Sequence, residues 1–327
     1  MKHALSITLF LVATFFLAQL LGLFIVSQYV NISSSAAAGK TVVYDETYEN
    51  AHFTPLMVEN ESTSFWYILV GVFFGTLLFL LLVKFKTRRL WKLWFFLSVL
   101  FCLVLGFTPF VSLFYRTFFS FVFPNTFLTL SYYTTLLLAL VLTYLKVFKR
   151  NVYVHNFTEL FIYGGLAALI VPLLNLFSVT MLLLLISVYD AYAVWKSKHM
   201  VAMAQFQSEE KTFAGLFIPY IPTEGGKAVL AKRTVLSSSK KFGSQDASFA
   251  GKVALLGGGD VAFPLLFSSV VLKTTTSFFS AFVISVCAAI ALFLLLYYAK
   301  KDAFYPAMPF ISAGCFVGYS LVWLFVL

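Results

Sequence analysis

The sequence predicts an all-α protein that crosses a membrane about nine times. Of its 327 residues, 61% are hydrophobic and 11% are charged, whereas about a quarter of the residues in a soluble domain carry charge. Long apolar runs recur along the chain, and basic residues gather in alternate segments between them. A chain of this composition cannot cover its surface with polar groups in water. We therefore expect a polytopic membrane protein.

Each transmembrane helix needs about 20 apolar residues, and nine segments satisfy this length. The predicted spans are 5–30, 64–83, 93–113, 126–145, 152–171, 175–195, 254–272, 277–299 and 304–327. Residues 152–194 are almost continuously apolar and too long for one span, so Pro172 and Asn175 are interpreted as a turn. The same runs also accommodate seven or eight spans. The first run is much longer than the roughly 7–15 apolar residues of a signal peptide, so we expect an uncleaved helix.

Basic residues predict the orientation. With a cytoplasmic N-terminus, 20 of the 23 Lys and Arg residues fall in cytoplasmic segments, and the other three are Lys40, Arg116 and Lys273. Membrane proteins concentrate positive residues on the cytoplasmic side. We therefore attribute the net charge of +10 to the basic residues of the cytoplasmic segments, which set the orientation in the membrane. The expected surroundings are a lipid bilayer, and no nucleic-acid partner is expected.

The predicted spans divide the chain into three parts. Residues 1–195 would form helices one to six, 196–253 a cytoplasmic loop, and 254–327 helices seven to nine. The first half of the loop is amphipathic enough to extend the sixth helix or to lie along the membrane surface. Its second half is rich in Gly, Ser and Lys, which is typical of a poorly ordered linker.

Two acidic residues lie inside predicted spans, near the same membrane border. Asp190 precedes Lys196 by six residues and Asp260 follows Lys252 by eight, which corresponds to depths of roughly 9 and 12 Å. A carboxylate in the bilayer core costs roughly 3 kcal/mol or more, and such residues commonly mark functional sites. If the two helices are neighbours, the carboxylates can meet. Glu159, in the fifth span, is interpreted as an interfacial or helix-bridging acid.

Two irregular sequences lie at a similar depth. The residues before Asp260 are all glycine, namely Gly257, Gly258 and Gly259. In "YPAMPF" at 305–310, two prolines interrupt helical hydrogen bonding at the entrance of the last span. Alone, a glycine triplet also fits helix packing and a proline pair fits an ordinary helix start. Irregular backbone at membrane depth is tolerated only where it is buried in protein or faces water, so their convergence with the acids predicts a site.

Two carboxyl groups can hydrolyse a peptide bond without a metal ion or a nucleophilic side chain. At about 3 Å they share one proton, because both cannot ionise in a low dielectric. The ionised group then takes a proton from water, and the protonated group donates to the scissile carbonyl. Asp190 and Asp260 are therefore a candidate catalytic pair, with no cofactor or metal expected.

"YD" at 189–190, "GGGD" at 257–260 and "PAM" at 306–308 resemble the signature of the presenilins and signal peptide peptidases. These are intramembrane aspartyl proteases with nine spans. The order of the motifs and the loop between the acids also fit, and the segments after 189 and 305 look most like the archaeal presenilin homologues. The resemblance is specific over about 185–327, and the first five spans match only in plan.

The resemblance implies that Asp190 and Asp260 are catalytic. It also implies that the neighbouring motif residues shape the substrate site, namely Tyr189, Gly257, Gly258, Gly259, Pro306, Ala307 and Met308. The family usually has Leu at the position of Met308, which suggests an altered substrate preference. The implied activity is that of an endopeptidase that cleaves single-span membrane proteins. Its active site would face the cytoplasmic side of an archaeal-type cell membrane.

Other functions are weighed against this one. The sequence contains neither His-Glu-x-x-His nor Gly-x-Ser-x-Gly, and its four histidines lie at or outside the ends of the spans. The alternative is a proton- or cation-coupled transporter that uses Asp190, Asp260 and Glu159 as relay groups. Such transporters often contain paired broken helices, and only one candidate, at Pro306, is evident. A scaffold protein would leave the shared depth of the acids unexplained.

Overall fold

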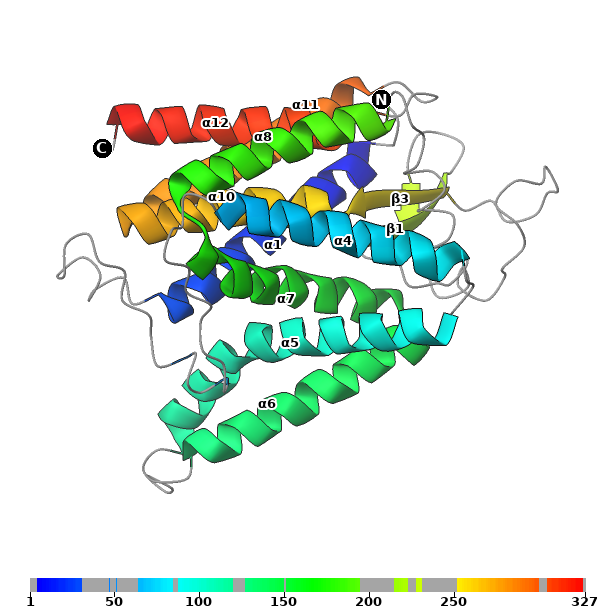
Figure 1. Ribbon diagram of the computed structural model, residues 1–327, viewed down its shortest axis with the longest axis vertical. Coiled ribbons are helices and arrows are strands. Elements are labelled where there is room, and N and C mark those ends of the chain that lie inside the picture. The colour runs from blue at the N-terminus through cyan, green and yellow to red at the C-terminus, as the bar shows by residue number, and fades with distance from the viewer. Residues whose placement is uncertain are drawn as a thin grey trace.

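The computed structural model contains nine α-helices within the residues that it describes (Figure 1). These residues are 5–30, 47, 51, 64–84, 88–119, 127–149, 151–194, 215–222, 228–230, 252–299 and 305–325. The helices are α1 (Leu5–Tyr29), α4 (Ser64–Lys84), α5 (Arg88–Phe118), α6 (Phe127–Tyr144), α7 (Val152–Ile170), α8 (Leu176–Tyr192), α10 (Gly258–Thr275), α11 (Phe278–Tyr298) and α12 (Ala307–Phe325). The predicted all-α class with nine helices is confirmed.

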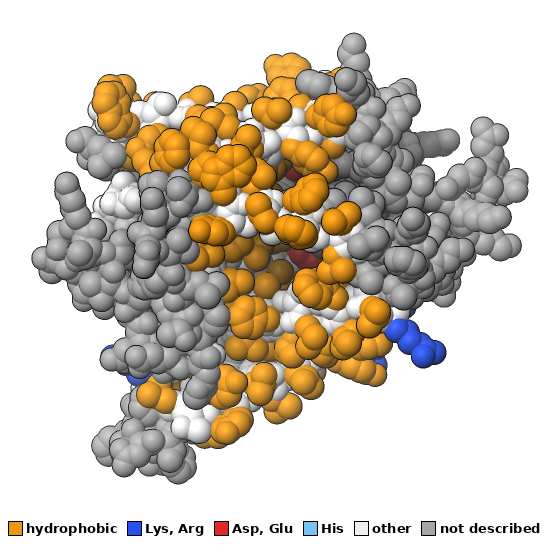
Figure 2. Space-filling view, in the orientation of Figure 1, with side chains coloured by type: hydrophobic (Ala, Val, Ile, Leu, Met, Phe, Trp, Pro, Cys, Tyr) orange, Lys and Arg blue, Asp and Glu red, His pale blue; other side chains and the backbone are white. Residues whose placement is uncertain are grey.

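Six of these helices are long and apolar enough to cross a membrane, judged by length and composition. The face seen in Figure 2 agrees with this, because hydrophobic side chains cover it and the visible Lys and Arg side chains lie at its margins. Acidic atoms appear only in hollows of that face. Large apolar side chains such as Trp94, Leu137 and Trp323 are more than half exposed, which is the arrangement expected of a surface that contacts lipid.

The predicted turn between the fifth and sixth spans is present. Residues Val171–Leu173 form a short 3-10 helix, and the Asn175 side chain caps α8 by accepting a hydrogen bond of 2.8 Å from the Ser178 N–H. Lys273, which we expected in an outer segment, lies buried in the last turn of α10. Its ammonium group donates to three carbonyl groups of this turn, at Val171, Pro172 and Leu174. Cations interact favourably with the free carbonyls at the end of a helix.

Helix α10 lies at the centre of the molecule. It packs against α1, α7, α8, α11 and α12, and nearly every residue from Val261 to Lys273 is buried. Apolar residues occur on all sides of α10. A helix of this kind is stable only when other elements surround it, which explains its central position. One hydrophobic core joins α10 to α1, α7, α8, α11 and α12, and a second joins α1, α5, α6 and α7.

The structure adds a small antiparallel sheet that we did not predict. Its strands are β1 (Gly215–Pro222), β2 (Ala228–Leu230) and β3 (Lys252–Gly257), in the order β2-β1-β3. Strand β1 therefore replaces the helix that we expected in the first half of the loop, and β3 replaces the predicted start of the seventh span, so α10 begins at Gly258. The rest of 196–253 lies outside the described residues, and its role as a linker stays a prediction.

Candidate active site

Asp190 lies near the end of α8, and the entrance of α12 binds it. The residue is 7% exposed, and its Oδ2 accepts a hydrogen bond of 3.2 Å from the Met308 N–H. Met308 is the second residue of α12, where backbone N–H groups have no partner within the helix and readily bind anions. The Pro-Ala-Met sequence thus starts a helix whose free N–H points at the first candidate acid.

Asp260 lies in the first turn of α10, directly after strand β3. The residue is partly buried, and its carboxylate interacts with the backbone N–H of Gly257, the N-cap residue. A carboxylate in the first turn is stabilised by the positive end of the helix dipole. The strand-to-helix junction therefore fixes the position of this acid.

The two aspartates lie on helices that pack against each other, Asp190 on α8 and Asp260 on α10. They are close enough to interact electrostatically, although 69 residues, from Ala191 to Gly259, separate them in the sequence. Each acid also has a backbone N–H partner, one at the start of α12 and one at the start of α10. Two acids that interact and are each oriented by a backbone donor can share a proton.

Gly257 leaves room for the Asp260 carboxylate. A Cβ atom on Gly257 would lie 3.1 Å from Asp260 Oδ2, whereas one on Gly259 would make an ordinary contact of 3.5 Å with the Phe263 ring. The two outer glycines of the motif therefore differ. In the structure it is Gly257 that keeps space free beside the carboxylate.

The other predicted site residues differ in their burial. Pro306 and Met308 are buried and Ala307 is partly buried, at the start of α12 beside Asp190. Gly258 begins α10. The side chain of Tyr189 is 55% exposed, so it points away from the buried Asp190 on the next position of the helix.

A contact that sequence reasoning missed supports the Asp190 side of the site. Ser187 Oγ lies 2.7 Å from Ser312 Oγ, and both side chains are buried. Ser187 is about one turn before Asp190 on α8, and Ser312 is about one turn after Met308 on α12. The pair therefore holds α8 and α12 together next to the Met308–Asp190 hydrogen bond. Two serines far apart in the sequence give no signal of such a pair.

Glu159 is buried and paired with a lysine. Its Oε1 lies 2.6 Å from Lys146 Nζ, which belongs to a π-helical turn (Leu145–Lys149) that follows α6. Glu159 thus bridges α6 and α7, as we expected of a helix-bridging acid. Among the described residues, no three His, Cys, Asp or Glu side chains are grouped as ligands for a metal ion.

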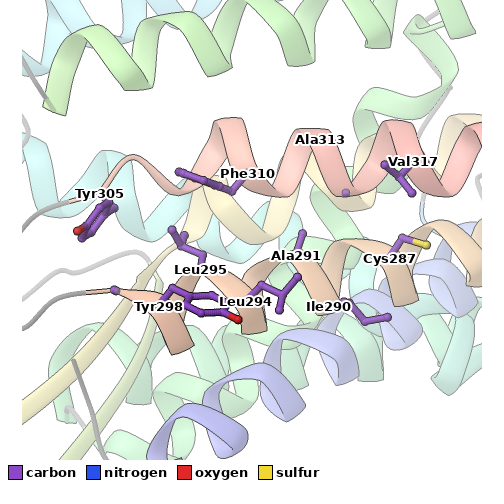
Figure 3. A pocket seen from close by; sticks show the side chains of 12 residues that line it. Cys287, Ile290, Ala291, Leu294, Leu295, Tyr298, Tyr305, Phe310, Ala313 and Val317 are labelled. Atoms are coloured by element: carbon purple, nitrogen blue, oxygen red, sulfur yellow. The ribbon is translucent and has the colours of Figure 1, made fainter. Parts of the chain in front are cut away.

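An apolar groove runs between α11 and α12, as Figure 3 shows. Its volume is about 530 Å³, and its lining includes Ile290, Leu294, Phe310 and Val317. Phe310 points into it from α12 (Figure 3), two positions after the Met308 that binds Asp190. Neither Asp190 nor Asp260 lines the groove, so it is separate from the acidic pair.

Comparisons with known proteins agree with this architecture. Residues 21–326 match the family described as "Signal-peptide peptidase, presenilin aspartyl protease". Two solved structures of a presenilin family intramembrane aspartate protease, in space groups P2 and C222, are similar at a TM-score of 0.56 and 17% identity. The similarity covers 95% of both chains for the first, and 96% of this chain and 97% of that chain for the second.

No curated protein matches the chain. The structural similarity identifies a presenilin-like fold, and the family match covers nearly the whole chain. This match decides between the two functions considered above, the protease and the transporter. The chain belongs to the signal-peptide peptidase and presenilin family, and it is a multi-pass intramembrane aspartyl protease.

Proposed function

We propose that Asp190 and Asp260 are the catalytic pair of this protease, and that it hydrolyses peptide bonds within the transmembrane segments of single-span membrane proteins. The observation that carries the proposal is that the two acids lie on the packed helices α8 and α10, interact electrostatically, and each have a backbone N–H donor. The motif residues that implied this pair in the sequence are the same ones that supply the donors, Met308 and Gly257.

In the proposed mechanism the pair holds one proton. The ionised carboxylate takes a proton from a water molecule as that water attacks the scissile carbonyl carbon, and the protonated carboxyl donates to the carbonyl oxygen. Proton transfer to the leaving amine then completes cleavage. The N–H groups of Met308 and Gly257 orient the carboxylates throughout and stabilise negative charge on them.

We propose that the substrate binds as a strand on the free edge of β3. Among the described residues β3 pairs with β1 alone, so its other edge offers backbone groups directly before Asp260. A helix hides its peptide bonds, and an unwound substrate in hydrocarbon needs hydrogen-bond partners for its backbone, each unsatisfied group costing several kcal/mol. Addition of a strand to a sheet edge supplies these partners.

We also propose that the site lies toward the cytoplasmic side of a cell membrane. The support is the charge distribution, in which most basic residues flank the ends of the spans that lie nearest to Asp190 and Asp260. Residues 196–253 would then form a cytoplasmic connection between the helices that carry the two acids.

The proposal is tested with purified protein and a single-span reporter substrate in detergent or liposomes. Wild type is expected to release two fragments cut within the apolar segment, and Asp260→Asn is expected to release none. Cleavage by Asp260→Asn at the wild-type rate would overturn the assignment of the pair. Cleavage restricted to sites outside the apolar segment would overturn the proposed substrate class.

A further inference from the structure

A second group of buried ionisable side chains lies where α6 ends and α7 begins. The ion pair between Lys146 and Glu159 is almost fully enclosed, with the two side chains 0% and 2% exposed. Lys146 Nζ also lies 3.4 Å from Thr158 Oγ1. His155, one turn before Glu159, places its Nε2 3.8 Å from Glu159 Oε1. The catalytic mechanism proposed above does not use these side chains.

Stability alone is a weak reason for burying an ion pair. Desolvation of the two charges offsets much of their attraction, and apolar residues of similar volume are often as stabilising. Buried charges are better suited to holding a particular geometry, because a charged partner strengthens and orients a hydrogen bond. In this cluster the ion pair lies beside His155.

His155 connects the cluster to the sheet. Its Nε2–H donates to the backbone carbonyl of Gly215, with the two atoms 2.8 Å apart. Gly215 is the first residue of β1 and has a φ of 149°, a conformation that residues with a side chain rarely adopt. The following strand is buried at Leu216 and Ile218. The start of β1 is therefore fixed by a hydrogen bond from α7 and by its own apolar side chains.

The residue that His155 holds is directly opposite the N-cap of α10. In the ladder between β1 and β3, Gly215 pairs with Gly257. Gly257 in turn contacts Asp260 through its backbone N–H, and its Cα hydrogen occupies the space next to Asp260 Oδ2. One hydrogen bond, one ladder pair and one backbone contact thus join His155 to the carboxylate of Asp260.

We infer that His155, held in place by the Lys146–Glu159 ion pair, is a positioning residue that sets the orientation of Asp260 through Gly215 and Gly257. The inference rests on the proposed catalytic role of Asp260. A shift of Gly215 moves Gly257, which displaces the N–H that orients the carboxylate. Such a change affects the chemical step more than substrate binding, because it acts at Gly257, the last residue of β3, whereas the rest of β3 keeps its pairing with β1.

The test compares two replacements of His155 that differ in one property. His155→Gln keeps an N–H donor for the Gly215 carbonyl, and His155→Leu has similar size but no donor. His155→Leu is expected to lower kcat for the reporter about tenfold, equivalent to about 1.4 kcal/mol in the barrier, with KM within twofold of wild type. His155→Gln is expected to stay within threefold of wild type in kcat.

Gly215→Ala tests the same connection from the sheet, since its side chain forces the backbone out of the observed φ. It is expected to lower kcat to a similar degree. Tyr153→Leu is the matched control, because Tyr153 is on the same helix and 70% exposed; its kcat is expected to match that of wild type. Thermal unfolding of each variant in detergent separates a loss of folded protein from a loss of rate.

The outcomes separate the inference from the proposed function. If wild type fails to cleave the reporter, or cleaves it without needing Asp260, the proposed function is wrong. If wild type cleaves through Asp260 while His155→Leu and Gly215→Ala keep full kcat, only the positioning role is wrong. Equal losses in His155→Gln and His155→Leu, with an equal fall in Tm, would also overturn it by indicating a purely structural histidine.

Discussion

Glu159 and the Asp190–Asp260 pair are acids in the same helical bundle, yet their surroundings differ. Glu159 has a lysine ammonium 2.6 Å away, whereas Asp190 and Asp260 each interact with a backbone N–H group. A lysine neutralises a carboxylate and keeps it ionised. Backbone donors also favour the ionised carboxylate, but they carry no full charge, so the carboxyl group can take up a proton without leaving a buried cation unpaired. The group that binds the carboxylate, more than its depth of burial, therefore distinguishes a structural acid from a reactive one.

The strongest way to break this comparison is to remove the acids one at a time. Asp190→Ala and Asp260→Ala are each expected to lower cleavage of a single-span reporter by at least about 10³-fold, because general acid–base catalysis is lost. Unfolding temperatures should stay near that of wild type, since no buried counter-charge is left behind. Near-normal turnover in either variant, measured in detergent, would contradict the assignment.

Glu159→Gln is expected to show the opposite pattern. It leaves the Lys146 ammonium buried without its partner, which costs about 3–5 kcal/mol in the free energy of unfolding. Cleavage per folded molecule should stay within about threefold of wild type, because Gln has the shape of Glu and keeps an oxygen beside Lys146 and His155, which preserves the His155–Gly215 hydrogen bond. The measurements are unfolding in detergent and active-site titration with a bound inhibitor. Recovery of stability in the double variant Lys146→Met with Glu159→Leu is the control, and an unchanged Tm in Glu159→Gln would contradict the idea.

Giving Asp190 a charged neighbour sharpens the comparison. Met308→Asp places a carboxylate in the buried turn whose N–H binds Asp190, and repulsion between the charges is expected to lower cleavage by about 10²-fold. Met308→Leu is the matched control, since it introduces the residue usual in the family and keeps an apolar side chain. It should keep the wild-type rate and change the choice of substrate. Equal activity of the two variants would mean that this turn is only a helix start.

A smaller effect is expected at the glycines. A methyl group on Gly257 would lie 3.1 Å from Asp260 Oδ2 and must displace it, whereas Gly259→Ala introduces an ordinary contact. Gly257→Ala is expected to lower kcat about tenfold, and Gly259→Ala by less than threefold. Cleavage assays on both proteins, with Tm as a check on folding, decide between them. A larger loss in Gly259→Ala would indicate that Gly259 contacts the substrate instead.

The smallest expected effect concerns the two serines that join α8 to α12. Ser187→Ala and Ser312→Ala each remove one partner of a buried contact of 2.7 Å, which costs about 1 kcal/mol in the free energy of unfolding. Because they share one contact, the double variant should lose about as much as either single variant. A double-mutant cycle on unfolding measures this coupling. Additive losses would indicate that the serines act independently.

The helices could be predicted from the sequence because a membrane imposes their length. The apolar run at 5–30 predicts α1 to within one residue, and the turn at Pro172 divides α7 from α8 as expected. The strands could not be predicted in the same way. Strand β1 is the middle strand of its sheet, yet it contains Pro219 and Pro222, residues that argue against a central strand.

Parts of the site were predictable for different reasons. Asp190 and Asp260 were conspicuous as charges in apolar runs, and their motifs resembled a known family. The partners that orient them were not, because pairs such as Met308 with Asp190, or Gly215 with Gly257, depend on contacts between distant segments. His155 illustrates the limit, since its position at the end of a span suggested an interfacial histidine, whereas its role depends on a strand that the sequence did not predict.

The three carbonyl groups that bind Lys273 have a consequence for how the protein is made. A lysine in the last turn of α10 is costly in lipid unless the 171–174 turn is present to receive it. We therefore expect α10 to reach its final depth only after the α7–α8 hairpin has inserted, so the second aspartate would join the first at a late step of biogenesis. Glycosylation mapping of truncated chains can test this order, which Lys273→Met should relax. Assembly itself would then keep the protease inactive until its helices are in place.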